Sequence, residues 1–219
     1  MALHVARARA SGSAIRVLDY GCGAGGFMEF ARMRSQKEES LRNIFEIHGF
    51  DIGSYANRLV AEKKFRILDE RGIAGCSGMY DVITCVEVIE HSRDVNLTMG
   101  NLSRLLKPGG LLVLTTGNLN CPAARLSGPD YRYIIPDIHI SLFNPDCLSL
   151  LYNKHGLSPV RVRYNGVLKY KVMTSIRSQG LKRFASAMLR VPGALSIIDL
   201  IYGVSAMPCA IKPMAELCL

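Results

Sequence analysis

A carboxylate followed by a run of glycines stands near the start of the chain. Residues 19–26 (Asp-Tyr-Gly-Cys-Gly-Ala-Gly-Gly) end a short apolar segment, 16–20, and precede residues 27–34, whose apolar positions recur with helical spacing. The pattern predicts a strand, a tight loop and a helix. Glycines let the backbone of such a loop approach a ligand closely, because a Cβ would obstruct that approach. The acidic residue beside it suits a positively charged group.

The loop alone is compatible with two kinds of nucleoside site. Gly21, Gly23 and Gly26 have the G-x-G-x-x-G spacing of dinucleotide-binding proteins. However, Asp19 lies two residues before the first glycine, where a carboxylate would repel a pyrophosphate but would attract a cationic amino-acid group. Asp51, at the end of the next predicted strand, can accept hydrogen bonds from ribose hydroxyls in either kind of site. The residues therefore indicate a nucleoside, and Asp19 favours one that carries a positive charge.

Alternating strand and helix patterns must position these residues. Strands are predicted at 16–20, 46–50, 81–86 and 111–116, helices at 27–34, 55–64 and 95–106, and a turn at 107–110. A helix at 145–155 with Asn144 as its N-cap and Gly156 as its terminator, a strand at 160–164, helical patterns over 172–202 and a last strand near 206–211 follow. The alternation predicts an α/β fold with a doubly wound, mostly parallel sheet.

Four segments together resemble the class I S-adenosylmethionine-dependent methyltransferases. Residues 17–25 resemble the first motif of that family, 49–52 its ribose-binding motif, 80–91 its fourth-strand signature and 105–112 the turn into its fifth strand. The fourth-strand segment is similar to the subgroup that holds ubiquinone-biosynthesis O-methyltransferases and many sugar and natural-product enzymes. The likeness covers 15–163. It implies a seven-stranded Rossmann-like sheet in a single domain, 1–219, with a cofactor half at 15–116 and a substrate half at 117–219, including a basic helical insertion at about 169–203 before the last strand.

The resemblance assigns cofactor roles residue by residue, with S-adenosylmethionine as the cofactor. Asp19 would hold the methionyl ammonium through the loop, and Asp51 would bind the ribose hydroxyls. Ile52 would pack on adenine. The backbone of the loop and the end of the fourth strand would border the methionyl portion through Gly21, Cys22, Gly23, Val86 and Glu87. For the family's third motif, which reads the adenine amine, Asp69 is the candidate.

Histidines and glutamates on the acceptor side could move a proton or hold a metal. His91 follows the fourth strand at the edge where α/β folds bind ligands, so its imidazole is a candidate general base. His139 lies in a segment, 136–145, that is similar to a substrate-facing stretch of the subgroup, and it is the second candidate. Glu87 and Glu90 are spaced so that, together with His91, they could converge on a divalent ion. Small-RNA 2'-O-methyltransferases and some quinone O-methyltransferases resemble this arrangement, and in those enzymes a metal orients hydroxyl oxygens. We assign no metal from the sequence, and this question stays open.

Residues 118–133 are predicted to be a loop, and Tyr131 and Tyr133 lie at its end. They are expected either to wall the acceptor site or to serve as ordinary packing residues. The chain departs from the family at its start, where about fourteen residues precede Ile15. A truncated sequence, a partner or the basic helices could account for a missing lid over the cofactor.

The positive charge is concentrated in one part of the chain. The net charge is +9, and residues 147–198 contain no acidic residue but nine Lys and Arg side chains, which equal the whole excess. Such a segment suits an anionic partner, namely a phosphorylated substrate, a membrane surface or RNA, or it is a solvated face. Seven scattered cysteines without a CxxC pair, and the lack of an apolar leader, favour a cytoplasmic protein with reduced thiols, with a peripheral place at the membrane as the alternative.

These observations lead to one expected activity and two alternatives. We expect S-adenosylmethionine-dependent O-methylation of a small-molecule hydroxyl on a sugar, lipid-linked or phenolic acceptor. The alternatives are an RNA 2'-O-methyltransferase, in which the basic segment contacts phosphates, and a catalytically idle binding protein of the same fold. The oligomeric state does not follow from the sequence.

Overall fold

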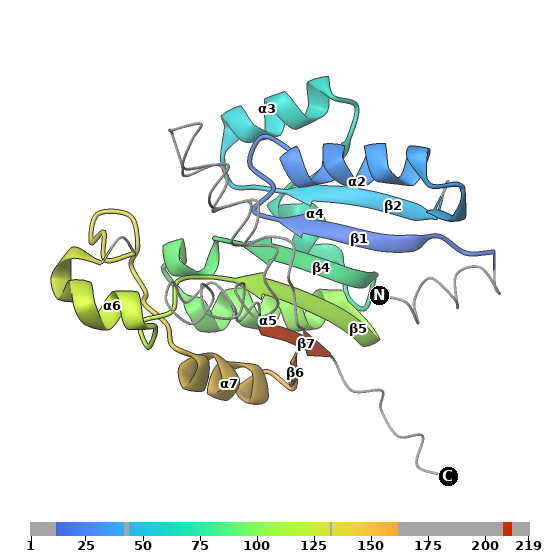
Figure 1. Ribbon diagram of the computed structural model, residues 1–219. Coiled ribbons are helices and arrows are strands. Elements are labelled where there is room, and N and C mark those ends of the chain that lie inside the picture. The colour runs from blue at the N-terminus through green and yellow to red at the C-terminus, as the bar shows by residue number, and fades with distance from the viewer. Residues whose placement is uncertain (1–11, 42–43, 132, 162–207, 212–219) are drawn as a thin grey trace, which may run out of the picture.

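The computed structural model describes residues 12–41, 44–131, 133–161 and 208–211, in which the strands form a sheet of order β3-β2-β1-β4-β5-β7-β6 (Figure 1). The strands are β1 (Ile15–Tyr20), β2 (Phe45–Phe50), β3 (Arg66–Leu68), β4 (Tyr80–Val86), β5 (Leu106–Thr115), β6 (Ser158–Arg161) and β7 (Pro208–Ile211). The helices are α2 (Gly26–Lys37), α3 (Ser54–Glu62), α4 (Glu70–Gly75), α5 (Val95–Leu105), α6 (Pro122–Ser127) and α7 (Pro145–Lys154). Short 3-10 helices are η1 (Glu39–Leu41), η2 (Ile89–His91) and η3 (Gly128–Asp130).

The strands that carry the glycine loop and the fourth-strand signature are parallel neighbours. β1 pairs in parallel with β2 and β4, β2 with β3, and β4 with β5, whereas β7 pairs antiparallel with both β5 and β6. The predicted mostly parallel α/β sheet is therefore confirmed. The helical insertion predicted at about 169–203 lies outside the described residues. None of the helices in the described part of the chain is long and apolar enough to cross a membrane.

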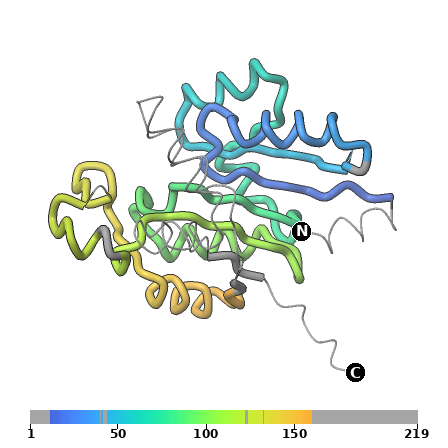
Figure 2. The backbone as a smooth tube through the Cα atoms, viewed as in Figure 1, coloured from blue at the N-terminus to red at the C-terminus, as the bar shows by residue number. Residues whose placement is uncertain are grey.

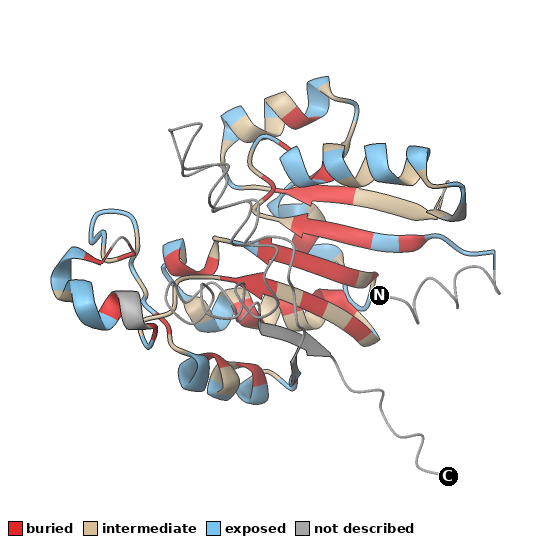
Figure 3. Ribbon diagram, viewed as in Figure 1, coloured by how far each residue is buried: buried red, intermediate tan, exposed pale blue. Residues whose placement is uncertain are grey.

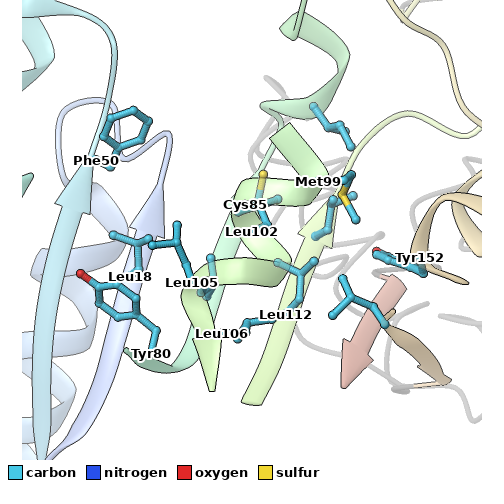
Figure 4. Packing of buried hydrophobic residues seen from close by; sticks show 14 of the residues in the cluster. Leu18, Phe50, Tyr80, Cys85, Met99, Leu102, Leu105, Leu106, Leu112 and Tyr152 are labelled. Carbon is cyan, nitrogen blue, oxygen red and sulfur yellow. The ribbon is translucent and has the colours of Figure 1, made fainter. Parts of the chain in front are cut away.

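Both faces of the sheet are covered, which makes it doubly wound. Alternate strand residues point to opposite faces, so one face packs against α4, α5 and α7 and the other against α2 and α3. Figure 3 shows that burial is greatest along the central strands. Figure 4 shows the larger core, in which Leu18, Tyr80 and Leu112 meet side chains of α5. This packing fixes the carboxyl ends of β1, β2 and β4 at a common edge.

Three features differ from the sequence-based predictions. Residues 118–133 were predicted as a loop, but they contain α6 and η3, which are too short to display a period. β3 and α4 were not predicted, because three strand residues and six helical residues are too short to display a period. Residues 107–110 were predicted as a turn before the fifth strand, but β5 already begins at Leu106. Tyr80 pairs with Leu106, but Val82 pairs with Leu111, so β5 has more residues than β4 over this stretch. Residues 107–110 therefore form an irregular part of β5.

Residues 118–143 leave the end of β5 and return to it with a small core of their own. Asn118 and Phe143 form a parallel bridge, and the Leu119 amide donates to the Phe143 carbonyl at 2.9 Å. Figure 2 shows the trace of this excursion beside the sheet, through α6 and back to α7. The buried side chains of this small core are Cys121, Ala124, Tyr131 and Tyr133. We call the whole excursion, residues 118–143, the 118–143 segment.

Candidate functional site

The three glycines with positive φ in the loop after β1 are required for three different reasons. Gly21 has φ 80°, and a Cβ there would lie 2.2 Å from the Val88 Cγ2 atom, so packing excludes a side chain. Gly25 has φ 75° and is the N-cap of α2, where a Cβ would lie 3.1 Å from Val60. At Gly23, φ is 50° and a Cβ would have no atom within 4 Å of it, so this glycine faces open space. Of the three, Gly23 is the one that leaves room for a ligand.

The backbone amides of the loop are tied to the end of β2. The amides of Gly21 and Cys22 both donate to the Phe50 carbonyl, at 2.7 and 3.1 Å. The Gly23 amide donates to Asp51 Oδ2 at 2.9 Å, and the Gly53 amide donates to Oδ1 at 2.8 Å. A carboxylate has about four acceptor positions, so Asp51 can bind the loop and still accept from a ribose. The two segments expected to hold the nucleoside are thus joined by the residue expected to bind its ribose.

Asp19 is a buried carboxylate at the end of β1. Its side chain is 4% exposed, and Thr84, its register partner on β4, donates from Oγ1 to Oδ1 at 2.8 Å. Burial raises the pKa of Asp19 to about 6, the Thr84 hydroxyl opposes this rise, and the charge of Asp51 adds to it. A cationic ligand beside Asp19 would stabilise the ionised form.

The other predicted cofactor contacts divide into exposed and buried residues. Ile52 is 84% exposed just beyond β2, and Val86 is 43% exposed at the end of β4, so both are available to a ligand. Cys22 is buried with Met28 between β2 and α2, so it can face a ligand only through its backbone. Asp69, the candidate for the third motif, accepts from the Gly72 amide at 2.7 Å and caps α4.

Glu90 is a buried carboxylate without a hydrogen-bonding partner in the described part of the chain. It is 1% exposed, and neither of its side-chain oxygens accepts a hydrogen bond there. Burial raises its pKa, and the nearby charge of Glu87 adds to this rise. A buried carboxylate of this kind is stable when it is protonated or when a cation lies beside it.

His91 and His139 lie beside Glu90, and in both rings Nδ1 is hydrogen-bonded to a main-chain carbonyl. The Nδ1 atom of His91 pairs with the Ile138 carbonyl, and that of His139 pairs with the Tyr133 carbonyl, each at 2.7 Å. A carbonyl only accepts, so Nδ1 carries the proton and Nε2 keeps its lone pair in the neutral ring. The two ring centroids are 4.8 Å apart. Each Nε2 can therefore take a proton or bind a metal.

Glu90, His91 and His139 form one cluster, whereas Glu87 does not join it. One ligand atom from each of the three lies within 4.8 Å of the others. This donor set, two imidazoles and a carboxylate, fits a divalent ion such as Mn²⁺, Fe²⁺ or Zn²⁺. The Glu87 carboxylate instead accepts hydrogen bonds from the hydroxyls of Thr115 and Tyr133. The spacing of the glutamates did not distinguish between these two placements.

Two threonines that orient acidic side chains were missed from the sequence. Thr84 holds Asp19, and Thr115 holds Glu87. Their only signal is their place in β-branched strand segments next to acidic strand ends, which packing alone also explains. Tyr131 and Tyr133 are both buried in the 118–143 segment. Tyr133 nevertheless reaches Glu87, so it both packs and contacts the site.

Comparison with known proteins gives the family. The methyltransferase domain family matches residues 1–162. The ubiquinone biosynthesis O-methyltransferase of Bradyrhizobium sp. (strain ORS 278) is 33% identical over 135 residues, which cover 56% of this chain and 48% of that protein. The enzyme of the same name from Xanthomonas oryzae pv. oryzae (strain PXO99A) is 32% identical over 126 residues, covering 54% and 50%. The chain thus spans about half the length of the curated relatives it matches.

Solved structures share the fold at low sequence identity. A SAM-dependent methyltransferase from Archaeoglobus fulgidus has a TM-score of 0.55 and 17% identity, covering 96% of this chain and 92% of its own. The Haemonchus contortus phosphoethanolamine N-methyltransferase 2, solved with S-adenosyl-L-methionine, has a TM-score of 0.50 and 19% identity, covering 92% and 49%. The predicted family, enzyme class and cofactor agree with these findings. The chain belongs to the methyltransferase domain family and has the class I fold of that family.

Proposed function

We propose that this protein transfers a methyl group from S-adenosylmethionine to a hydroxyl oxygen of a small molecule. The observation that carries the proposal is the cluster that Glu90 and His91, just after β4, form with His139 of the 118–143 segment. β4 is also the strand whose Thr84 holds Asp19. O-methylation needs a group that relieves a hydroxyl of its proton, and an imidazole with a free Nε2 can do so near neutral pH. The likeness to ubiquinone biosynthesis O-methyltransferases supports oxygen as the acceptor atom.

The surroundings of the histidines favour an acceptor with an apolar part. Ile138, whose carbonyl holds His91, has a side chain that is 50% exposed, and Ile135, Ile140 and Leu142 nearby in the chain are 40%, 58% and 39% exposed. Apolar side chains gathered beside polar catalytic groups are typical of sites for aromatic or lipid-linked compounds. We therefore favour a phenolic or lipid-linked hydroxyl over a free sugar.

The roles that we propose for the residues combine the family resemblance with the contacts in the site. S-adenosylmethionine, when bound, supplies a methyl group on a positively charged sulfur. Asp19 binds the cationic methionyl portion, Asp51 binds the ribose, and Ile52 packs on the base. On the acceptor side, the Nε2 atom of His91 or His139 takes the hydroxyl proton while the acceptor oxygen forms its bond to the methyl carbon and the carbon–sulfur bond breaks. The products are a methyl ether and S-adenosylhomocysteine.

A divalent ion also fits this acceptor side. Glu90, His91 and His139 would hold it, and the lack of hydrogen bonds to Glu90 in the described structure is the observation that favours a cation there. A bound ion would lower the pKa of an acceptor hydroxyl. The histidines would then act as ligands, and the proton would leave to solvent.

The test is methyl transfer from tritiated cofactor to a panel of phenolic and polyhydroxy acceptors, with and without Mn²⁺. We expect His91→Ala and His139→Ala to lose turnover by about a hundredfold while cofactor binding, measured by calorimetry, stays within twofold. His155→Ala is the matched control, because His155, at the end of α7, contacts Asn96 of α5 and lies outside the cluster. Full turnover in both cluster variants would refute the acceptor assignment.

The basic segment, 147–198, supports one competing activity. Its nine cations could contact the phosphates of an RNA, in which case the hydroxyl would be a ribose 2'-OH. RNA binding that weakens steeply with added salt, together with labelling of RNA, would favour that acceptor. Absence of cofactor binding by calorimetry would instead indicate a catalytically idle member of the family.

A further inference from the structure

Glu87 lies next to the acceptor cluster in sequence but is kept out of it in the structure. It precedes Glu90 by three residues, and η2 turns the chain between them. Glu90, His91 and His139 converge within 4.8 Å, and Glu87 is not part of that group. Glu87 could thus supply a fourth ligand, but its side chain lies outside the cluster.

Donors fix both oxygens of the Glu87 carboxylate. The Thr115 hydroxyl donates to Oε1 at 3.1 Å, and the Tyr133 hydroxyl donates to Oε2. The Glu87 amide donates to the Thr115 carbonyl at 3.0 Å, and the residue has φ 56°, a conformation that non-glycine residues adopt only when their surroundings impose it. The position of this carboxylate is thus set by its contacts with Thr115 and Tyr133.

Tyr133 links this held carboxylate to the cluster. Its ring stacks on that of His139 with centroids 5.5 Å apart, and its carbonyl accepts from His139 Nδ1. The tyrosine is 9% exposed, and its ring lies so close to Gly117 that a Cβ there would be 2.4 Å from ring carbons. One buried, closely packed residue therefore orients a cluster histidine and retains Glu87.

We propose that Tyr133 is a positioning residue that keeps Glu87 away from the cluster, so that a divalent cation binds there through Glu90, His91 and His139 only. This inference rests on the proposed function, in which that cluster faces the acceptor. A fourth protein ligand would occupy one of the coordination positions that are otherwise open to the acceptor. A second carboxylate would also offset more of the charge with which a cation polarises that hydroxyl.

The experiment measures Mn²⁺ binding to the whole chain by calorimetry and by the loss of the free-ion electron paramagnetic resonance signal. Tyr133→Phe removes the hydroxyl but keeps the ring on His139, so it releases Glu87, and we expect Mn²⁺ to bind about tenfold more tightly. Glu87→Gln alone should leave the affinity within twofold of wild type, and the double variant should lose the gain. Tyr131→Phe is the matched control, because that hydroxyl pairs with Cys121 in the same small core. Thr115→Val, which removes the other hydroxyl, should give a smaller gain and replaces Tyr133→Phe if the latter does not fold.

Three results would overturn the proposal. These are an unchanged or weaker Mn²⁺ affinity in Tyr133→Phe, a gain that persists in the double variant with Glu87→Gln, and a lack of Mn²⁺ binding by every protein in the set. Methyl transfer is measured separately on the same preparations. A set that shows the expected pattern of Mn²⁺ affinities but transfers no methyl group supports the positioning role and contradicts the proposed function.

Discussion

Replacement of the buried Asp19 by asparagine should change stability and cofactor binding in opposite directions. The folded protein holds the Asp19 proton more tightly than the unfolded chain does, because burial raises the pKa from the ordinary 3.8 to about 6. Ionisation of Asp19 therefore destabilises the cofactor-free fold, and this loss develops as the pH rises from about 4 to about 6. At higher pH it amounts to on the order of 3 kcal/mol.

Asp19→Asn removes this loss because the amide does not ionise. We expect the cofactor-free variant to be more stable than wild type at pH 8, by up to about 3 kcal/mol in urea unfolding, and to show no such advantage at pH 4. Cofactor binding should weaken, because the variant lacks the carboxylate that binds the cationic methionyl portion. A loss of about 2 kcal/mol for one charged hydrogen bond corresponds to roughly thirtyfold in Kd at pH 8.

Calorimetry of S-adenosylmethionine binding between pH 5 and pH 8 tests the second half of the prediction. Wild-type affinity should fall about tenfold between pH 8 and pH 5, because the ionised fraction of a group with a pKa of about 6 falls by that factor. The asparagine variant should lose this dependence. Thr84→Val, the matched control, should move the midpoint to higher pH, because the Thr84 hydroxyl stabilises the ionised form. The reasoning is refuted if Asp19→Asn binds cofactor as tightly as wild type or is no more stable at pH 8.

Three further perturbations test local features of the fold. Gly21→Ala should lower the free energy of unfolding by about 2 kcal/mol, because φ is 80° there and the added Cβ would lie 2.2 Å from Val88. Gly23→Ala, where the added Cβ meets open space, should lower it by less. Urea titration of the two variants compares these losses. Arg104→Met should lower Tm, because the guanidinium donates to three main-chain carbonyls at the end of α4, and an unchanged Tm contradicts this role. Burial lowers the pKa of His48, so wild type should lose stability as the pH falls below about 6.5, and His48→Phe should abolish that part of the slope in urea unfolding at pH 7 and pH 5.

Local chemistry explains why the cofactor half could be predicted from the sequence. The strand, glycine loop and helix around Asp19 show themselves in neighbouring residues, because glycine spacing, an apolar run and a helical period are local signals. The same holds for α7, whose predicted N-cap, Asn144, accepts from the Cys147 amide at 2.8 Å. Short elements such as β3 and α4 carry too few residues for a period.

The acceptor half depends on contacts between residues far apart in the chain. The sequence by itself determined the α/β fold, the glycine loop and the acidic residues at the ends of β1 and β2, since those follow from propensity and periodicity. Only the tertiary structure decided that Glu90 joins His139 while Glu87 turns to Tyr133, 46 residues away. Spacing fixes where two carboxylates stand along the backbone, but their orientation depends on which hydroxyls and imidazoles the packed chain brings within hydrogen-bonding distance.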